Sequence, residues 1–494
     1  MRLSFMLRFP GSHYGIDPYY HVYVSKMILS EGIPTYNPYH FYGTLHDYPP
    51  LFHFVIASFI YLFGEKYSPI VSSILGALTT VLMYQIGEKL KRGLGIIAGF
   101  FFSVIPLDLT YTNSYLRPDS LSILLISAEI LVILRLLHSE NKKDTIWLSI
   151  LLASLLGLHS FSHKSWILVY LLILTFSIGY YVMYFEIRIP ISLISSTVLG
   201  YSIGSLLYLS ICPWMFHGNM VGTIEGLLST LSSIGGESRS VAFQKPLVAG
   251  MFYYMSILPL FAWIFGLASM FREIHVKKYF FLIYSSLFFF FSYSVAFRMG
   301  AYFEVFLCPI AAIGVVKFWE LIRELRIGEA QKFLLRLLVF LLMILTGIHG
   351  VISVAEMKPT IPREELALVE LASEHYRGRS FSLWDRGHLL AYYGFSTFVD
   401  GYPSLENSAV YDEIMWEVIR SRERRVAIDA LENEIKPDII FLDFRIEKWN
   451  EDLPRWLTES EKYYLIGIAL KGNRTAYLFL RCSHEGGCCN TCIR

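Results

Sequence analysis

Residues 166–185 read WILVYLLILTFSIGYYVMYF, a run of twenty residues without a charged side chain. A helix that spans a lipid bilayer needs about 20 consecutive apolar residues, and this run has that length. Similar apolar runs recur along the chain as far as residue 354. The run is therefore one of a series, and the sequence predicts a polytopic α-helical membrane protein.

We expect about ten transmembrane helices, one at each long apolar run. These runs are Ile70–Ile86, Leu94–Leu109, Leu121–Leu137, Ile146–Leu158, Trp166–Phe185, Ile191–Ile211, Met251–Phe271, Tyr279–Phe297, Tyr302–Leu321 and Leu334–Val354. A further run, Leu51–Phe63, follows Tyr48-Pro49-Pro50 and is too short for a full span. It predicts an interfacial or re-entrant helix, with a crossing helix as the alternative.

The composition agrees with this interpretation. Of the 494 residues, 54% are hydrophobic and 17% are charged, whereas a soluble domain has about 25% charged residues. The mean hydropathy is +0.47. Since 42 basic residues nearly balance 41 acidic ones, the chain has no excess of positive charge for nucleic acid, and we expect no nucleic-acid partner.

The basic residues indicate how the helices are oriented, because cytoplasmic loops carry an excess of Lys and Arg. They fall in alternate loops, at Lys89, Lys91, Arg92, Lys142, Lys143, Arg188, Arg272, Lys277, Lys278, Arg323, Arg326, Lys332 and Arg336. The other loops, including 212–250, and everything after Val354 then face outward. Residues 1–66 would form an outer loop too. No signal peptide or first helix delivers them there, so we expect that a first helix is missing.

The composition changes after residue 355, where the predicted membrane domain ends. Residues 356–480 are more polar, with a helical run at Glu364–Tyr376. Strand-like runs follow at Asp438–Phe444, Tyr463–Ala469 and Ala476–Leu480. This segment is long enough to form its own core. It predicts an outward-facing mixed α/β domain on a multi-pass protein of the cell membrane.

Residues 481–494 form a cysteine-rich tail. It contains Cys482, His484, Cys488, Cys489 and Cys492. These side chains could hold zinc or form a disulfide. A disordered tail is the simpler interpretation.

Two carboxylates stand at predicted outer helix ends, where an ionisable group is costly and therefore often functional. Asp17 lies in GIDPYYH, residues 15–21, and Asp119 lies in YLRPDS, residues 115–120. Each could bind a divalent cation such as Mg²⁺ or Mn²⁺, which prefer oxygen ligands. Each could instead cap the helix that follows. Arg117 could neutralise Asp119 or bind a phosphate.

Three further segments contain candidate residues. The outer loop 212–250 carries Glu225 and Glu237 among glycines, which indicates either a mobile segment that closes over a substrate or a long solvated loop. Arg298, close to Tyr302 in FRMGAYF, could snorkel to the interface or clamp an anionic headgroup. In SLWDRGH, residues 382–388, an aromatic and a carboxylate precede a predicted short helix, which the carboxylate could cap.

Together and in this order, these segments resemble the catalytic subunit of oligosaccharyltransferases, in its archaeal and bacterial single-subunit form. That family combines a GT-C membrane fold with an outward soluble domain. It transfers a glycan from a lipid-linked pyrophosphate to the asparagine of an Asn-x-Ser/Thr sequon. The resemblance implies a GT-C-like fold, a polyprenyl- or dolichyl-linked glycan donor, an acceptor polypeptide, contact with membrane lipid, and Mn²⁺ or Mg²⁺ as cofactor.

The resemblance also assigns roles to residues. Asp17 matches the aspartate of the family's first outer loop, and Glu237, or less closely Glu225, matches the catalytic glutamate of its mobile fifth loop. Asp17, Asp119 and Glu237 would share the cation. The expected substrate-binding residues are Arg117, Arg298, Tyr302, Trp384 and Asp385.

Some positions depart from the family pattern. Arg117 stands where the first acid of an Asp-x-Asp pair belongs, and Leu383 and Arg386 replace two aromatic residues of the Trp-Trp-Asp-Tyr-Gly signature. Two alternative functions follow. One is a GT-C glycosyltransferase that uses a lipid monophosphate sugar on a non-protein acceptor. The other is a catalytically degenerate subunit that only binds lipid-linked glycan.

Overall fold

The computed structural model describes residues 1–10, 12–37, 40, 45–113, 115–225, 248–295, 299–398, 408–460, 462–472 and 474–481. Its contacts divide the chain into two compact units. The first unit contains Met1–Gly11, Tyr48–Val55 and Lys66–Lys358, and the second contains Ser12–Asp47, Ile56–Glu65 and Pro359–Arg494. Most of the N-terminal segment that we assigned to an outer loop is thus grouped with the C-terminal residues.

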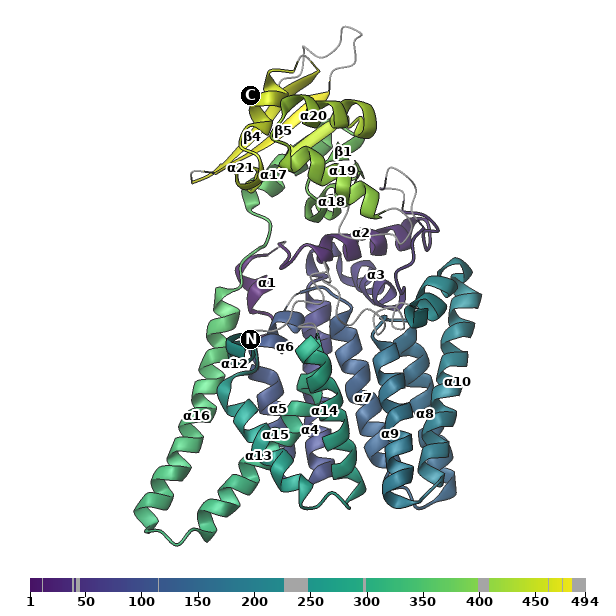
Figure 1. Cartoon of the computed structure of the whole chain (residues 1–494), viewed down its shortest axis with the longest axis vertical. Helices are drawn as coiled ribbons and strands as arrows, with labels where there is room; N and C mark the ends of the chain where they lie inside the picture. Colours follow the sequence, from purple (N-terminus) through teal and green to yellow (C-terminus); the bar gives the residue numbers. More distant parts are fainter. Residues whose placement is uncertain are drawn as a thin grey trace. The chain divides into compact units, whose positions relative to one another are not determined.

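The first unit is helical, and its long helices run side by side (Figure 1). They are α1 (Ser4–Arg8), α4 (Ile70–Leu90), α5 (Leu94–Val104), α6 (Pro106–Thr112), α7 (Asp119–Leu136), α8 (Lys142–Ser160), α9 (Trp166–Tyr184), α10 (Arg188–Ile211), α12 (Val248–Met255), α13 (Ile257–Phe271), α14 (Lys277–Val295), α15 (Gly300–Glu324) and α16 (Glu329–Glu356). Short turns at η2 (Pro213–Met215) and η3 (His217–Val221) follow α10. All ten predicted spans are thus helical over most of their length.

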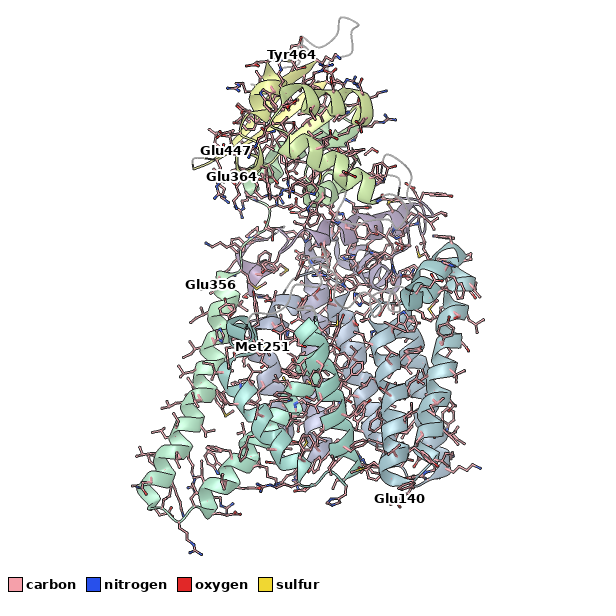
Figure 2. All side chains as sticks on the ribbon, in the orientation of Figure 1. Glu140, Met251, Glu356, Glu364, Glu447 and Tyr464 are labelled. Carbon is pink, nitrogen blue, oxygen red and sulfur yellow. The ribbon has the colours of Figure 1, made fainter. Side chains whose placement is uncertain are left out.

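Within the described residues, five helices are long and apolar enough to cross a membrane, namely α9, α10, α15, α16 and α4 with the turn before it. A sixth span results if α5 and α6, which are bent by 67°, count as one. By length and composition the number is therefore five or six, below the ten that we predicted. The chain is a membrane protein, and Figure 2 shows the side chains that cover its helices, with Glu140 in the connection between α7 and α8.

Two of the predicted spans are interrupted in the structure. Pro106 starts α6 directly after the extended Ile105, and proline supplies no N–H to continue the helix before it. Between α12 and α13, Ser256 has φ 64° and its hydroxyl lies 2.9 Å from Nδ1 of His349. The segment Leu51–Phe63 forms the short apolar helix α3, with the bounds that the sequence predicted.

Small residues let some helices of this unit approach closely. On α13, Ala262 and Gly266 face Gly314 of α15, where a Cβ atom would meet the carbonyl oxygen of Ala262. Likewise, Gly200 of α10 packs against Leu156 of α8. Small residues spaced by four are a common way to pack helices in a membrane, where close van der Waals contact replaces the hydrophobic effect.

The second unit contains a five-stranded mixed sheet with the order β2-β1-β3-β5-β4. Its strands are β1 (Arg379–Phe381), β2 (Ser396–Thr397), β3 (Ile439–Leu442), β4 (Tyr463–Lys471) and β5 (Arg474–Arg481). β1 pairs in parallel with β2 and β3, and β5 pairs antiparallel with β3 and β4. The three strands that we predicted, β3, β4 and β5, are confirmed, and β4 carries a bulge between Leu465 and Gly467.

The same unit contains several helices. They are α2 (Asp17–Ser30), α17 (Arg363–His375), α18 (Trp384–Tyr392), α19 (Ser408–Arg420), α20 (Arg424–Asp429), α21 (Ile446–Trp449) and α22 (Leu453–Thr458), with a π-helical turn η6 (Ala430–Ile435). α2 belongs to the core because Tyr19 packs in the same apolar cluster as Leu389, Phe395 and Phe441. The N-terminal motif and the C-terminal motif thus lie in one compact unit.

Candidate functional site

The first helical turn of α7 brings together three of the predicted site residues. Asp119 is fully buried, and its Oδ2 lies 3.1 Å from Nε of Arg117. The hydroxyl of Tyr302, on α15, donates to Asp119 Oδ1 at 3.4 Å. Arg117 also stacks over the rings of Tyr111 and Tyr115. The structure therefore brings Tyr302 to the neighbouring pair Arg117 and Asp119, although Tyr302 is far from that pair in the sequence.

The position of Asp119 has a local cause. Pro118 occupies the N-cap position of α7 and has no side-chain hydrogen bond to the helix, so Asp119 is the first helical residue. Negative charge is favourable at that end of a helix because the unpaired N–H groups there carry partial positive charge. The helix and the guanidinium of Arg117 together compensate for burying the carboxylate.

Asp17 opens α2 in the second unit. It is half-buried, and the N-cap position is held by Ile16, whose side chain makes no capping bond. Three residues farther on, the hydroxyl of Tyr20 lies 3.1 Å from Nδ1 of His46, and its ring lies 5.2 Å from that of His388 on α18. Burial lowers the pKa of His46 to about 4, so this imidazole is neutral at physiological pH.

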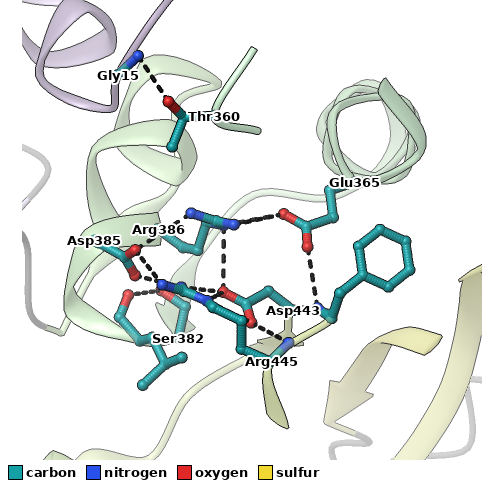
Figure 3. A network of polar contacts seen from close by, with 10 residues as sticks. Gly15, Thr360, Glu365, Ser382, Asp385, Arg386, Asp443 and Arg445 are labelled. Atoms are coloured by element: carbon teal, nitrogen blue, oxygen red, sulfur yellow. Dashed lines mark hydrogen bonds and ion pairs between the residues drawn. The ribbon is translucent and has the colours of Figure 1, made fainter. Parts of the chain in front are cut away.

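The segment that resembles the Trp-Trp-Asp-Tyr-Gly signature starts α18 (Figure 3). Trp384 is 39% exposed, whereas Asp385 is buried. Both oxygens of Asp385 accept hydrogen bonds at 2.6 Å from the guanidinium of Arg445. This fork-to-fork arrangement is the strongest geometry for an arginine–carboxylate pair, and it fixes the carboxylate that the resemblance assigns to substrate binding.

Arg445 and Arg386 connect three carboxylates into one network (Figure 3). Arg386 lies 3.0 Å from Glu365, 3.3 Å from Asp385 and 3.3 Å from Asp443. Arg445 donates to Asp443 through Nε at 2.9 Å. Burial raises the pKa of Glu365, although Arg386 opposes that shift. Burial would lower the pKa of Arg445, but its bonds to Asp385 and Asp443 reverse the effect and raise it.

Arg386, which replaces a tyrosine of the family signature, forms ion pairs inside this unit. Arg386 is 4% exposed and bonds Glu365 on α17, and the other oxygen of Glu365 accepts the backbone N–H of Phe444 at 3.0 Å. The network ties α18 to α17 and to the segment after β3. Its ion pairs thereby fix the position of the turn at Trp384.

Of the remaining predicted residues, the structure describes Glu225. Glu225 is exposed at the end of the described part of the loop after α10. Glu237 and Arg298 lie outside the described residues, as do residues 482–494 of the cysteine-rich tail. Asp17, Trp384 and Asp385 belong to the second unit, and Arg117, Asp119 and Tyr302 to the first.

The described residues alone do not form a metal site. Among them, no group of three His, Cys, Asp or Glu side chains is arranged to hold a metal ion. Asp119 engages Arg117 through one oxygen and Tyr302 through the other. A cation there would have to compete with the guanidinium, since two positive groups repel each other.

Sequence reasoning missed a pair of buried polar residues on α7 and α8. Glu129 on α7 and His159 on α8 are fully buried and lie 3.1 Å apart, from Oε1 to Nδ1. The signal was present in the sequence, since Glu129 interrupts the apolar run 121–137. An acid at such a position usually has a partner and a function.

Comparisons with known proteins agree with the fold. Residues 47–217 match the family model described as dolichyl-phosphate-mannose-protein mannosyltransferase. Dolichyl-phosphooligosaccharide-protein glycotransferase 2 of Archaeoglobus fulgidus is 35% identical over 105 residues. This match covers 19% of the chain and 18% of that relative, which is less than a fifth of its length.

Solved structures match over nearly the whole chain. The apo oligosaccharyltransferase of Archaeoglobus fulgidus superposes with a TM-score of 0.71 at 10% identity, covering 97% of this chain and 72% of the other. Structures of that enzyme also exist with an inhibitory peptide and dolichol-phosphate, and with Zn and sulfate.

A second fold relative has nearly the same length as this chain. ArnT of Cupriavidus metallidurans bound to undecaprenyl phosphate superposes with a TM-score of 0.60 at 12% identity, covering 96% of this chain and 95% of the other. The chain therefore has the GT-C-type fold, and a stretch of 105 residues is similar in sequence to an archaeal dolichyl-phosphooligosaccharide-protein glycotransferase.

Proposed function

We propose that this protein is a membrane glycosyltransferase that transfers a glycan from a lipid-linked pyrophosphate to the asparagine of a sequon. The observation that carries the proposal is the buried group of Arg117, Asp119 and Tyr302 in a GT-C-type fold. These are the residues that the sequence resemblance selected. A polyprenyl- or dolichyl-linked glycan and an acceptor polypeptide are the corresponding substrates.

The chemistry requires help from acidic groups. An amide nitrogen is a poor nucleophile because resonance delocalises its lone pair. We propose that Asp17 and Glu237, or alternatively Glu225, accept hydrogen bonds from the amide N–H groups and orient the nitrogen. Trp384 and Asp385, at the start of α18, would hold the acceptor peptide. Arg117 and Arg298 would bind substrate anions.

A divalent cation, Mn²⁺ or Mg²⁺, belongs to the proposal as well. Asp17, Asp119 and Glu237 would hold it, and the cation would offset charge on the departing pyrophosphate. The pair Arg117–Asp119 shows that this chain already places one positive group at the carboxylate. Arg117 therefore supplies part of the neutralisation that a metal would provide.

The test uses purified membranes, lipid-linked glycan and a fluorescent sequon peptide, with and without Mn²⁺. We expect a slower-migrating glycopeptide from the natural chain and none from Asp17→Ala. The matched control is Glu31→Ala, because Glu31 is exposed directly after the same helix, α2. Unchanged transfer by Asp17→Ala at equal protein abundance would reject the assignment of Asp17.

A second candidate function is supported by the pair Arg117–Asp119 and by the match to nearly all of ArnT. An arginine in place of an acid reduces the need for a metal, which suits a lipid monophosphate sugar donor and a non-protein acceptor. The same assay distinguishes the two functions. Activity that resists EDTA, with no glycopeptide formed, would favour this second function.

A further inference from the structure

A chain of polar side chains leads from the start of α7 into the helical part of the first unit. Ser122 and Glu129 lie on α7, His159 lies in the last turn of α8, and His163 and Ser165 lie between α8 and α9. All but His163, which is half-buried, are at most 6% exposed. Glu129 is ten residues beyond Asp119, which corresponds to roughly 15 Å along the helix.

These side chains form an unbroken series of short contacts. Glu129 Oε1 lies 3.1 Å from His159 Nδ1, and His159 Nε2 lies 2.8 Å from the Ser122 hydroxyl. The Ser122 hydroxyl lies 2.6 Å from that of Ser165, which lies 2.8 Å from His163 Nδ1. The Ser165 hydroxyl also lies 3.1 Å from His159 Nε2, so it meets His159 directly as well as through Ser122.

Tyr302 places the end of the series beside the candidate site. Its hydroxyl lies 3.3 Å from His163 Nδ1 and 3.4 Å from Asp119 Oδ1. The series therefore links a deeply buried acid to the residues that carry the proposed function.

The arrangement leaves room for one more proton. The backbone N–H of Ser165 donates to His163 Nδ1 at 3.1 Å, so that nitrogen acts as an acceptor. When Glu129 is ionised and His159 is neutral, the Nδ1–H of His159 bonds Glu129 and its Nε2 accepts from a serine hydroxyl. The pair Glu129–His159 can then take up one proton at Nε2.

We propose that Glu129 and His159 form a buried proton acceptor for the transfer reaction, reached through Ser122, Ser165 and His163. This proposal depends on the proposed function. As the C–N bond forms and the sugar–phosphate bond breaks, the electron pair leaves with the phosphate and the acceptor nitrogen loses a proton. His163 receives that proton, each serine accepts one and releases one, and His159 becomes an imidazolium beside the Glu129 carboxylate.

The surroundings suit this role. Oε2 of Glu129 has no hydrogen-bond partner among the described residues, and the same holds for the buried hydroxyl of Tyr170 on α9. Tyr170 is close enough to interact electrostatically with Glu129. Further titratable or charged groups stand at the outer end of the series, namely Lys164 between His163 and Ser165, Tyr302, and the pair Arg117–Asp119. The carboxylate of Glu129 is therefore the group that stabilises an imidazolium at His159.

The first test compares Glu129→Gln and Ser165→Ala in the peptide assay from pH 5.5 to 8.5. Glutamine keeps an acceptor for His159 but cannot carry the negative charge. Ser165→Ala removes the hydroxyl that joins His163 to both Ser122 and His159. We expect either variant to lower kcat at least tenfold, in the range of general acid–base effects, with KM for the peptide within twofold and an altered pH profile. The control is Ser127→Ala, because Ser127 is buried on α7 and only bonds the Ile123 carbonyl.

A second measurement does not require transfer. Infrared difference spectra between pH 5.5 and 8.5 of the full chain in detergent should contain a histidine protonation signal that His159→Gln removes and Glu129→Gln shifts to lower pH. If the natural chain transfers no glycan but shows this signal, the proposed function fails and the proton acceptor stands. Natural kcat and pH profile in both Glu129→Gln and Ser165→Ala, or a spectrum that His159→Gln leaves unchanged, would overturn the proposal.

Discussion

Arg445 illustrates how one side chain can determine the local geometry of a motif. Its side chain is 37% exposed, yet it bonds Asp385 through two nitrogens and Asp443 through Nε. Removing it would leave two nearly buried carboxylates next to Arg386 alone. The loss of one partner of a buried pair is costly because the other charge stays desolvated.

We predict that Arg445→Gln weakens the α18 region by about 2 kcal/mol, less than the 3–5 kcal/mol typical of a fully buried pair. The check is hydrogen–deuterium exchange of α18 and β3 in the full chain, where that loss corresponds to roughly 30-fold faster opening. Arg424→Gln is the matched control, since Arg424 and Glu459 are half exposed at 3.2 Å. A surface pair contributes at most about 1 kcal/mol. Equal effects of both variants would contradict the prediction.

Two buried histidines make the stability of the second unit depend on pH. Burial lowers the pKa of His13 and of His46 to about 4, compared with 6.5 in the unfolded chain. The unfolded state therefore binds more protons between these values, so stability is fully present above pH 6.5 and falls as the pH drops towards 4. Each histidine contributes at most about 3 kcal/mol to this loss.

We predict a melting temperature that falls steadily from pH 7 to 4.5, followed by tryptophan fluorescence in detergent. His46→Gln should flatten this fall, because glutamine does not titrate and can still bond Tyr20. His375→Gln, at an exposed position that ends α17, should leave the fall unchanged. If His46→Gln and the natural chain lose stability equally, His46 is not the cause.

At the level of helices, the contact between α13 and α15 depends on the absence of side chains. A Cβ on Gly314 would collide with the carbonyl oxygen of Ala262 and come within 2.9 Å of the Gly266 nitrogen. Backbone atoms cannot move aside as a flexible side chain can. Alanine at this position must separate the two helices.

We predict that Gly314→Ala destabilises the first unit by about 1–3 kcal/mol, the usual cost of overpacking. A lower melting temperature of the purified protein would reveal it. Gly347→Ala on α16 is the matched control, because its Cβ would meet only Phe100 Cζ at an ordinary 3.8 Å. Equal melting temperatures of the two variants would show that the helices can separate without cost.

Elements with strong patterns could be predicted from the sequence, and weak ones could not. The long apolar runs marked the helices, and the bounds of α3 were predicted as they stand in the structure. β1 and β2 have three and two residues, too few for a hydrophobic pattern, and they depend on pairing with β3 and with each other. The breaks at Ile105 and Ser256 went unseen because both lie inside continuous apolar runs.

Side-chain partnerships were predictable only in part. Arg117 and Asp119 are neighbours in the sequence, so their pairing could be proposed directly. The bond between Asp385 and Arg445 joins residues 60 positions apart, and only the fold brings them together. The sequence therefore indicated Asp385 as a substrate-binding residue, but it did not predict the pairing of Asp385 with Arg445.

For the molecule as a whole, the basic loops predict which side of the membrane each segment occupies. We expect a membrane-impermeant maleimide to label Tyr464→Cys on intact cells, in a chain whose six native cysteines are replaced. Tyr464 is 53% exposed on β4. Lys142→Cys, at the exposed start of α8, should react only after the membrane is opened. The reverse pattern would mean that the orientation is inverted.

The bulge in β4 affects how copies of this protein meet. β4 lies at the edge of the described sheet, and Tyr464, Ile468 and Leu470 are more than half exposed along it. A regular edge strand with exposed apolar side chains could pair with a strand of a neighbouring molecule. The extra residue at Ile466 interrupts the regular spacing of the backbone hydrogen-bonding groups halfway along β4. We therefore expect that neighbouring copies in one membrane do not form a continuous intermolecular sheet along this edge.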